Sequence, residues 1–427
     1  VEADDVLTLI YTSGTTGPPK GVQITHANIC ETVRSYDQII QFEAGGRVVS
    51  YLPMAHVAER NVSHYLGMLL GFSVTCCPDP RTVAQYLPEV HPTWFFGVPR
   101  IYEKVKAGLE AMLAGLPAGE QKDSLQGALD LSLERVRLLQ ADQPVPDELE
   151  RRWQEIDAQV LSNIRTMLGF DQLEACNVGA APTPPEVIEF FHALGVPLAE
   201  LWGMSETTGA GTCNPPERIK IGTVGPPAPG IDIKLAEDGE VLIRGPVIMA
   251  GYRNQPEKTR ESFTDDGFLM TGDVGEFDAD GYLKIVDRKK ELIIGAGGKN
   301  MSPANIESKL KSAGPLIGQA IAIGDGRPYN VALLTLDPDA VPLLAKELGA
   351  EGLSLEQLAA DERVIAKVAE EVEQANAQLA RVEQIKRFTL LESEWQPGGE
   401  ELTPTMKLKR KPIAALYADQ IEALYSG

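Results

Sequence analysis

The chain has 427 residues and a formal net charge of −22. A chain of this length exceeds what one hydrophobic core supports and predicts two or three packing units. The acidic balance argues against a nucleic-acid partner, because binding to phosphate backbones requires a basic surface.

The cysteine content predicts a reducing compartment. The five cysteines form no CxxC pair and no zinc-binding spacing, so we expect free thiols that behave as small buried hydrophobes. They are Cys30, Cys76, Cys77, Cys176 and Cys213. No apolar run is long enough to span a membrane and no secretory signal is recognisable, which together with the thiols predicts a cytoplasmic protein.

Short apolar runs alternate with helical patterns in the first half of the chain. Strands are predicted over residues 5–11, 48–52, 93–96 and 173–178, and helices over 105–113 and 149–164, the second ending at Gly169. This alternation predicts an α/β fold with a largely parallel sheet, in which we expect the first strand to be buried. Residues 103–168, interrupted at 143–146, are interpreted as a helical insertion on the surface.

The pattern changes near residue 224. Residues 231–235, 240–245 and 281–287 alternate apolar and polar side chains between Asp-Gly turns, which predicts a small antiparallel sheet or barrel. Further on, we predict a helix from Pro303, strands over 319–324 and 330–336, and an acidic helix over 362–381. The expected fold is a large α/β domain over residues 1–286, with a β-rich part over 224–286, followed by a compact α+β domain over 288–427.

The string YTSGTTGPPKGV, residues 11–22, has the composition of a phosphate-binding turn. It follows a predicted strand, its glycines let backbone N–H groups converge on an anion, and its lysine adds a positive charge. The spacing GxxxxGK[ST] is absent, so it is not a Walker loop. The candidate residues are Thr12, Ser13, Gly14, Thr15, Thr16, Gly17 and Lys20.

This string resembles the phosphate loop of the adenylate-forming superfamily, which includes acyl-CoA synthetases, firefly luciferase and the adenylation domains of peptide synthetases. Further motifs follow in the family's order, and the resemblance extends over essentially the whole chain. It implies ATP as a substrate and Mg²⁺ as a cofactor. LWGMSET, residues 201–207, resembles the family's aromatic-Gly-x-Thr-Glu motif, with Trp and Ser where Tyr and Thr are usual.

Within that motif, Trp202 and Gly203 are candidates for the adenine site, because a flat indole can stack on the base. Ser205 offers a hydroxyl to phosphate, and Glu206 a carboxylate to Mg²⁺, so both are candidate metal ligands. A second short turn resembles the small-residue segment that lies against adenine in the family. Its residues are Gly179, Ala180 and Ala181.

Two strings near the expected domain boundary resemble the family's ribose motifs. Asp273 in TGD would accept hydrogen bonds from both ribose hydroxyls, and Arg288 in VDRKKELI would donate to one. The resemblance makes Asp287 the hinge of a mobile C-terminal domain, although DRKKE taken alone is an ordinary solvated charge run. GAGGKN resembles the segment that lines the pantetheine arm of CoA and supplies Gly297 and Gly298, with a simple loop as the alternative.

The candidate catalytic residues are Glu206 and two others. LTPTMKLKR, residues 402–410, resembles the family's C-terminal lysine loop and assigns the catalytic lysine to Lys407, with Lys409 as the alternative register. Its charge would offset the negative charge that develops on the α-phosphate. His56 in YLPMAHVAER resembles the histidine beside the acyl carboxylate, and a packed structural role is its alternative.

HPTWFFGVPRIYEKV, residues 91–105, resembles the long-chain fatty acyl-CoA synthetase branch. We therefore expect ATP-dependent activation of a medium- to long-chain fatty acid to acyl-AMP and its transfer to CoA. The phosphate loop lies nearer to Val1 than in the family, so we expect a missing N-terminal segment. Two alternatives stay open: a non-catalytic fragment that needs a separate N-terminal piece, and a ligase that loads a carrier protein. Peripheral membrane contact and a homodimer also stay open.

Overall fold

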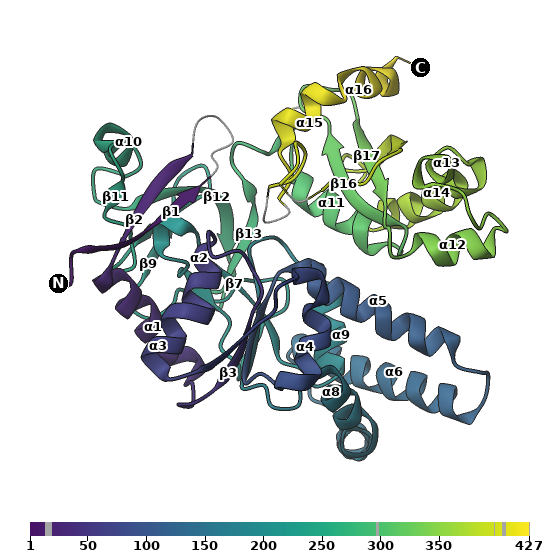
Figure 1. Cartoon of the computed structure of the whole chain (residues 1–427), viewed down its shortest axis with the longest axis horizontal. Coiled ribbons are helices and arrows are strands. Elements are labelled where there is room, and N and C mark those ends of the chain that lie inside the picture. Colours follow the sequence, from purple (N-terminus) through teal and green to yellow (C-terminus); the bar gives the residue numbers. More distant parts are fainter. Residues whose placement is uncertain (13–18, 296–298, 397, 404–406, 427) are drawn as a thin grey trace. The chain divides into compact units, whose positions relative to one another are not determined.

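The computed structural model describes the chain except residues 13–18, 296–298, 397, 404–406 and 427, and the side chain of residue 121. The chain divides into two compact units, one of residues 1–271 and 275–285, the other of residues 272–274 and 286–427. Figure 1 labels many of the helices and strands of both units.

The first unit begins with a hairpin. Strands β1 (Val6–Thr12) and β2 (Lys20–Thr25) are antiparallel, and β2 also pairs with the short β11 (Gly251–Tyr252). The strand predicted over residues 5–11 is therefore confirmed. Its expected burial is wrong: in β1 only Ile10 is buried, because β1 is the edge strand of this sheet and has a neighbouring strand on one side only.

A parallel sheet forms the centre of the first unit. Strands β5 (Trp94–Gly97), β6 (Ala175–Val178) and β7 (Leu198–Trp202) are parallel neighbours, and β8 (Thr212–Cys213) pairs antiparallel with β7. Strands β3 (Arg47–Ser50) and β4 (Ser73–Cys76) form a separate parallel pair. Every residue of β5 and β6 is buried, which explains their largely apolar sequences. The α/β prediction is confirmed here, although the hairpin sheet is antiparallel.

Helices pack around this sheet (Figure 1). The predicted helical segment corresponds to α5–α8, and its Leu109, Leu129 and Leu161 join the core that contains Phe95 and Cys176. The segment therefore contributes these side chains to the core, while most of its residues are exposed or half-buried. The helices are α1 (His26–Ile40), α2 (Val57–Glu59), α3 (Leu66–Leu70), α4 (Val83–Val90), α5 (Pro99–Gly115), α6 (Glu120–Gln140), α7 (Asp147–Ile156), α8 (Ser162–Leu168) and α9 (Pro185–Ala193), with π-helices η1 (Arg60–Tyr65) and η3 (Asp157–Leu161) and 3-10 turns η2 (Pro80–Thr82) and η4 (Ser205–Thr207).

A β-rich segment follows residue 224, as predicted. Strands β9 (Asp232–Leu235), β10 (Glu240–Arg244), β12 (Leu269–Phe277) and β13 (Leu283–Arg288) form one sheet in the order β13-β12-β10-β9, and α10 (Pro256–Glu261) lies in the connection before β12. Three of these strands are predicted from the sequence. Strand β12 is not, because its buried positions include the polar Thr271 and Asp273.

The second unit is built on a three-stranded sheet. Strand β17 (Asn330–Leu336) lies between β16 (Ile317–Ile323), which is antiparallel to it, and β18 (Ile385–Leu391), which is parallel. All of β17 is buried, with Leu334 in one core cluster and Leu333 in another that contains Trp395. The other elements are β14 (Ile293–Ile294), β15 (Asn300–Met301), α11 (Pro303–Ser312), α12 (Val341–Glu347), α13 (Leu355–Ala359), α14 (Glu362–Ala377), α15 (Arg410–Leu416) and α16 (Ala418–Tyr425).

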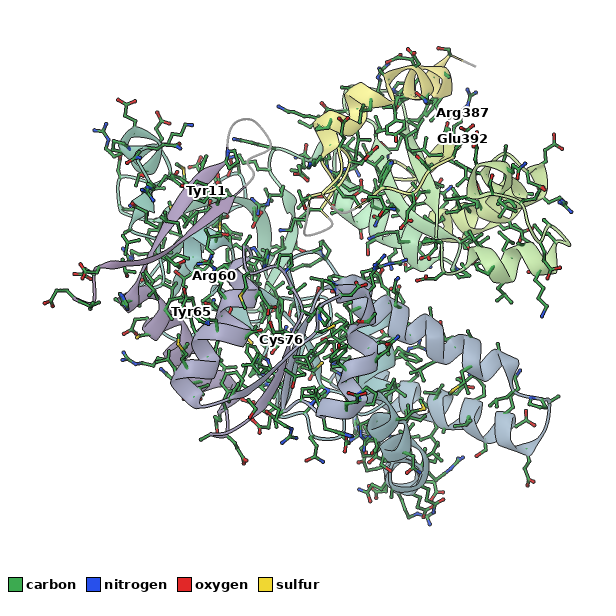
Figure 2. All side chains as sticks on the ribbon, in the orientation of Figure 1. Tyr11, Arg60, Tyr65, Cys76, Arg387 and Glu392 are labelled. Atoms are coloured by element: carbon green, nitrogen blue, oxygen red, sulfur yellow. The ribbon has the colours of Figure 1, made fainter. Side chains whose placement is uncertain are left out.

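Two expectations about the chain's environment concern cysteines and membranes. All five cysteines are free thiols, and Cys77, Cys176 and Cys213 are buried as expected. Cys30 and Cys76 are exposed, so burial was wrongly expected for them; Cys76 is labelled in Figure 2. In the part of the chain that the structure describes, no helix combines the length and the apolar character that crossing a bilayer requires.

Two helix-ending glycines allow a matched stability test. Gly169 and Gly71 end α8 and α3 with φ of 74° and 73°. A Cβ on Gly169 would lie 2.0 Å from the backbone oxygen of Leu87, whereas nothing lies within 4 Å of a Cβ on Gly71. We expect Gly71→Ala to lower the free energy of unfolding by about 1 kcal/mol and Gly169→Ala by roughly 1–3 kcal/mol more, because α4 must shift. Denaturant titration measures both, and equal losses would contradict the steric argument.

Candidate active site

Two predicted nucleotide motifs emerge from one edge of the parallel sheet. Residues 179–181 follow β6, and residues 203–206 follow β7. Because β6 and β7 are parallel neighbours, both loops leave from the carboxyl ends of their strands. Ligands of open α/β sheets bind outside this edge. The structure therefore brings the two motifs together.

The first of these loops is a tight turn. The N–H of Gly179 donates to the backbone oxygen of Gly97 at 3.2 Å, and a Cβ on Gly179 would lie 3.2 Å from the backbone oxygen of Leu201. Ala180 has a φ of 71°, in the left-handed region that alanine seldom adopts, and Ala181 is exposed. Small side chains around an exposed turn leave room for a flat ring.

The second loop begins with closely packed residues. A Cβ on Gly203 would lie 2.4 Å from the backbone oxygen of Gly209, so only glycine allows this approach. Trp202 is 9% exposed and lies in a core cluster, and a Cβ on Gly211 would lie 2.6 Å from its ring. Most of the indole is therefore used in packing, and stacking on adenine would use the small part that remains accessible.

Glu206, Tyr252 and Lys20 form a charged group in the first unit. The hydroxyl of Tyr252 donates to Oε1 of Glu206 at 2.9 Å, and Nζ of Lys20 lies 4.5 Å from the centre of the Tyr252 ring. Glu206 is 8% exposed and Tyr252 7%. Burial, and then the charge of Glu206, raise the pKa of Tyr252, so the phenol stays protonated and remains a donor. The group joins the lysine of the phosphate loop to the predicted metal carboxylate.

The loop after Glu206 is held by three hydrogen bonds from other elements. The hydroxyl of Tyr36 donates to the backbone oxygen of Gly209 at 2.8 Å, and Nδ2 of Asn61 donates to that of Thr208 at 2.6 Å. Thr208, with a left-handed φ of 55°, donates from Oγ1 to the backbone oxygen of Val247 at 2.7 Å. These bonds fix the backbone from which Glu206 projects.

Several predicted site residues lie outside the described residues. They are Ser13, Gly14, Thr15, Thr16 and Gly17 of the phosphate loop and Gly297 and Gly298 of the CoA segment. The residues that flank the phosphate loop are described, and Thr12 and Lys20 face each other as register partners across β1 and β2.

The metal assignment can be tested against the available donors. Among the described residues, no group of three or more His, Cys, Asp and Glu side chains could hold a metal ion. Glu206 therefore offers one carboxylate, with the hydroxyl of Ser205 next to it in sequence. This sparse set fits Mg²⁺, which takes one or two carboxylates and completes its coordination with water and substrate phosphates.

His56 has a structural contact. It is the N-cap of α2, where its Nδ1 accepts from the N–H of Ala58 at 3.3 Å. Because Nδ1 accepts, the neutral ring carries its proton on Nε2. On the same helix, the buried carboxylate of Glu59 accepts from the hydroxyls of Ser50 at 2.6 Å and Ser63 at 2.5 Å. The capping role of His56 is thus present, and its role beside an acyl group stays a prediction.

The two predicted ribose residues contact each other within the second unit. Nε of Arg288 lies 2.7 Å from Oδ1 of Asp273. The Asp273 side chain is 5% exposed and that of Arg288 48%. This pairing gives Asp273 a charged partner and a defined orientation.

The lysine loop belongs to the second unit, and its residues 404–406 lie outside the described residues. The N–H of Thr403 donates to the backbone oxygen of Lys407 at 2.8 Å, and the N–H of Lys407 donates to Oγ1 of Thr403 at 3.0 Å. Lys407 is exposed, whereas Nζ of Lys409 donates to the backbone oxygen of Gly399 at 2.8 Å. The assignment of the catalytic lysine to Lys407, with Lys409 as the alternative register, stays a prediction.

Comparison with known proteins gives the family. The sequence-family model of the AMP-binding enzymes matches residues 1–253 of this chain, and the family model of the AMP-binding enzyme C-terminal domain matches residues 290–427. The chain belongs to the AMP-binding enzymes. These adenylate-forming enzymes are the superfamily that the motifs indicate.

Curated relatives place this AMP-binding enzyme in the long-chain fatty acyl-CoA synthetase branch. It is 49% identical over 427 residues to the putative fatty-acid–CoA ligase fadD11 of Mycobacterium tuberculosis, covering 100% of this chain and 75% of that protein. It is 37% identical over 439 residues to the long-chain-fatty-acid–CoA ligase FadD15 of Mycobacterium bovis, covering 100% and 70%. It is 33% identical to the long-chain-fatty-acid–CoA ligase ACSBG2 of Xenopus laevis, covering 98% of this chain and 60% of that protein.

Solved structures share the fold of this AMP-binding enzyme. The adenylation domain of a carboxylate reductase from Mycobacterium chelonae has a TM-score of 0.71 at 21% identity, covering 100% of this chain and 61% of that one. The o-succinylbenzoate CoA synthetase MenE of Bacillus subtilis, in complex with AMP, has a TM-score of 0.65 at 22% identity, covering 96% and 69%. The predicted fold class is confirmed.

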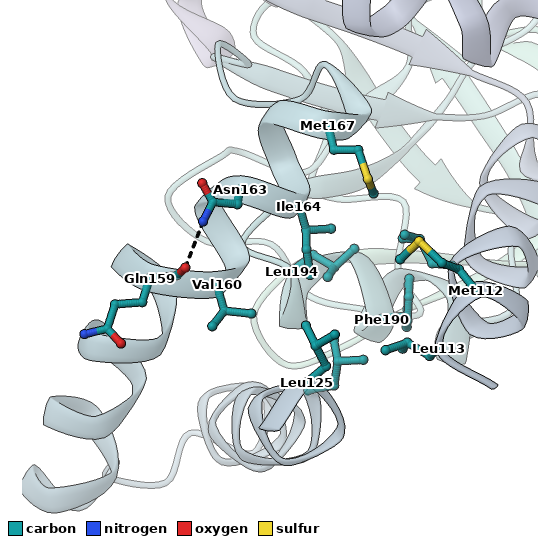
Figure 3. A pocket seen from close by; sticks show the side chains of 12 residues that line it. Met112, Leu113, Leu125, Gln159, Val160, Asn163, Ile164, Met167, Phe190 and Leu194 are labelled. Atoms are coloured by element: carbon teal, nitrogen blue, oxygen red, sulfur yellow. Dashed lines mark hydrogen bonds between the residues drawn. The ribbon is translucent and has the colours of Figure 1, made fainter. Parts of the chain in front are cut away.

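An apolar pocket lies apart from the nucleotide motifs of this AMP-binding enzyme. It has a volume of about 290 Å³ and lies between α5, α6, α8 and α9 (Figure 3). None of the predicted site residues lines it. The lining residues are Leu109, Met112, Leu113, Leu125, Leu129, Gln159, Val160, Asn163, Ile164, Met167, Phe190 and Leu194.

The sequence analysis missed residues that support the site. Tyr252, Asn61 and Tyr36 act on the loop at Glu206, but none belongs to a string that indicates chemistry by itself. Tyr252 is brought to the site by the pairing of β11 with β2, which joins segments far apart in the chain. Such a pairing cannot be read from local patterns.

Glu200 gives a pH-dependence prediction. Its Oε1 accepts from the N–H of Thr183 at 3.3 Å, and burial raises its pKa to about 8 although this hydrogen bond opposes the shift. A carboxyl whose pKa is raised in the folded state stabilises the fold fully below its unfolded pKa. This contribution is lost as the pH rises through the folded pKa, here about 8. In the wild type we therefore expect the free energy of unfolding to fall by up to about 1.4 kcal/mol per pH unit between pH 5 and 8. Glu200→Gln should abolish this fall.

Denaturant titrations at several pH values measure this slope. Glu217 is exposed, so Glu217→Gln is the matched control, and we expect its free energy of unfolding to depend on pH as in the wild type. Identical slopes for wild type and Glu200→Gln would contradict the prediction.

Proposed function

We propose that this chain activates a medium- to long-chain fatty acid with ATP to acyl-AMP and transfers the acyl group to CoA, releasing pyrophosphate and AMP. The observation that carries the proposal is the Glu206–Tyr252–Lys20 group at the carboxyl edge of the sheet. It brings a phosphate-loop lysine and a carboxylate to one place, as a bound triphosphate requires. The names of the relatives support the fatty acid and CoA as the other substrates.

In the first step the fatty carboxylate attacks the α-phosphate, and pyrophosphate leaves. Lys20 and the phosphate loop hold the phosphates, the turn at residues 179–181 and Trp202 accept adenine, and Asp273 accepts hydrogen bonds from the ribose. Arg288 keeps the Asp273 carboxylate oriented. Lys407 offsets the charge on the α-phosphate as the new bond forms. Positioning and charge stabilisation supply the rate, because this transfer gives the protein little covalent chemistry.

Glu206 and Ser205 would hold Mg²⁺ together with phosphate oxygens. The bound cation neutralises charge on the phosphates. Tyr252 keeps the Glu206 carboxylate oriented through its hydrogen bond to Oε1 and leaves the second carboxylate oxygen as a ligand. His56, with its proton on Nε2, would lie beside the acyl carboxylate.

In the second step the CoA thiol attacks the mixed anhydride and AMP leaves. We propose that residues 288–427 move about a hinge at Asp287, which withdraws Lys407 and presents Gly297 and Gly298 to the pantetheine arm. The hydroxyl of Ser302 donates to Oδ2 of Asp287 at 2.5 Å, which ties the proposed hinge to the start of α11.

The relatives' names do not favour the two alternatives, a non-catalytic fragment and a ligase that loads a carrier protein. A cytoplasmic location, peripheral membrane contact and a homodimer stay predictions.

The first test concerns Lys407. We expect Lys407→Ala to lower fatty-acid-dependent exchange of pyrophosphate into ATP by about 100-fold or more, because a charge that stabilises the transition state is lost. Formation of acyl-CoA from added acyl-AMP should persist. Lys409→Ala is the register control and should retain exchange. Intact exchange in Lys407→Ala would refute the assignment.

The second test separates the two contacts of Tyr252. Tyr252→Phe keeps the ring and removes the hydroxyl, and with it the hydrogen bond to Glu206, so we expect affinity for ATP to fall about three- to tenfold with Mg²⁺ present and to stay unchanged with EDTA. Tyr252→Leu also removes the ring below Lys20, so affinity should fall about two- to fivefold in EDTA as well. Calorimetric titration without fatty acid measures both.

Tyr282 is the matched control for this test. It also has a lysine over its ring, Lys220 at 5.4 Å, and its hydroxyl donates to the backbone oxygen of Arg218 at 2.9 Å. Tyr282→Phe and Tyr282→Leu should keep wild-type nucleotide affinity. A Tyr252→Phe variant with unchanged affinity under both conditions would remove Tyr252 from the site.

A further inference from the structure

The arginine at the end of the lysine loop makes three charged hydrogen bonds. Arg410, the first residue of α15, donates from its two terminal nitrogens to Oε1 and Oε2 of Glu307 at 2.6 and 2.8 Å. Its Nε donates to Oε2 of Glu291 at 3.0 Å. We call these three residues the Arg410 cluster. The side chains are 20% exposed for Arg410, 6% for Glu307 and 25% for Glu291, so water competes little for these bonds.

The Arg410 cluster joins three segments of the second unit. Glu307 is on α11, and its Oε1 also accepts from the N–H of Ala322 on β16 at 2.8 Å, which fixes the carboxylate to the sheet. Glu291 lies just after Arg288, to whose backbone oxygen its own N–H donates at 2.9 Å. Arg410 therefore ties the lysine loop both to the core and to the segment that carries the ribose arginine.

The cluster lies close to Lys407 along the chain. Only Leu408 and Lys409 separate Lys407 from Arg410, so roughly 10 Å of chain at most joins the two Cα atoms. Between Lys407 and Arg410, the N–H of Lys409 donates to the backbone oxygen of Glu401 at 2.7 Å. A shift of the guanidinium is therefore passed to the backbone of Lys407.

The geometry requires arginine rather than any cation. A planar guanidinium bonds both oxygens of one carboxylate and still presents Nε to a second carboxylate. A lysine at this position keeps the charge but has one nitrogen, so it cannot hold both glutamates in the same arrangement. Burial raises the pKa of Glu307, and the charge of Arg410 opposes this shift, so the pair depends on close contact.

We propose that Arg410 is a positioning residue for Lys407: through Glu307 and Glu291 it sets where the lysine loop lies in the adenylation step. The inference rests on the role proposed for Lys407. Because the second step does not use Lys407, loss of the Arg410 cluster should slow adenylation and spare thioester formation.

The test uses Arg410→Lys with Arg327→Lys as the matched control. Arg327 is also in the second unit and pairs with Glu422 on α16. We expect Arg410→Lys to lower fatty-acid-dependent pyrophosphate exchange about ten- to a hundredfold, as a displaced catalytic group does. Thioester formation from added acyl-AMP and CoA should change less than about threefold, and Arg327→Lys should leave both near wild type. Equal losses in both steps for Arg410→Lys, or no loss in either, would overturn the proposal.

A double-mutant cycle separates positioning from a general structural effect. If Arg410 acts through Lys407, adding Arg410→Lys to Lys407→Ala should cause no further loss of exchange, because the group being positioned is absent. A full additional loss in the double variant would overturn the proposal. Intact exchange in Lys407→Ala alone would instead refute the proposed function, so the two failures are distinguishable.

Discussion

A carboxylate buried at the edge of a sheet is costly unless a donor satisfies it and a positive charge lies close. Glu206 has its donor in the hydroxyl of Tyr252, and Lys20 lies over the ring of the same tyrosine. The three residues come from η4, β11 and β2, so the requirement also makes the pairing of β2 with β11 necessary. The hairpin and the parallel sheet therefore depend on one another at the point where the nucleotide motifs meet.

Much of the fold is predictable where burial and periodicity agree. NVALLTL is largely apolar because β17 is covered on both faces, and it is identified as a strand for that reason. The helical pattern that ends at Gly169 is confirmed because a left-handed glycine stops α8 where the sequence indicates. Motif order was enough to indicate the family, and the local geometry at residues 179–181 and 203–206 agrees with a nucleotide site.

The missed features have physical reasons. Strand β12 alternates as a strand should, but its buried positions include Thr271 and Asp273, so an apolar pattern does not reveal it. Glu206 and Tyr252 meet through a strand pairing, and Arg410 meets Glu307 through tertiary packing, which no local string encodes. The roles of Lys407, His56, Asp273 and the phosphate loop stay predictions, since their assignment depends on family resemblance.

The π-helix η1 fixes the number of residues between α2 and α3. It continues from α2 into α3, and the N–H of Leu66 donates to the backbone oxygen of Asn61, one residue further back than in an α-helix. Deleting one residue inside η1 would restore ordinary α geometry and rotate the preceding turn by about 100°. Glu59 would then turn away from Ser50, and the His56 cap would leave its place. In this stretch the number of peptide units is therefore constrained as well as the identity of the buried side chains.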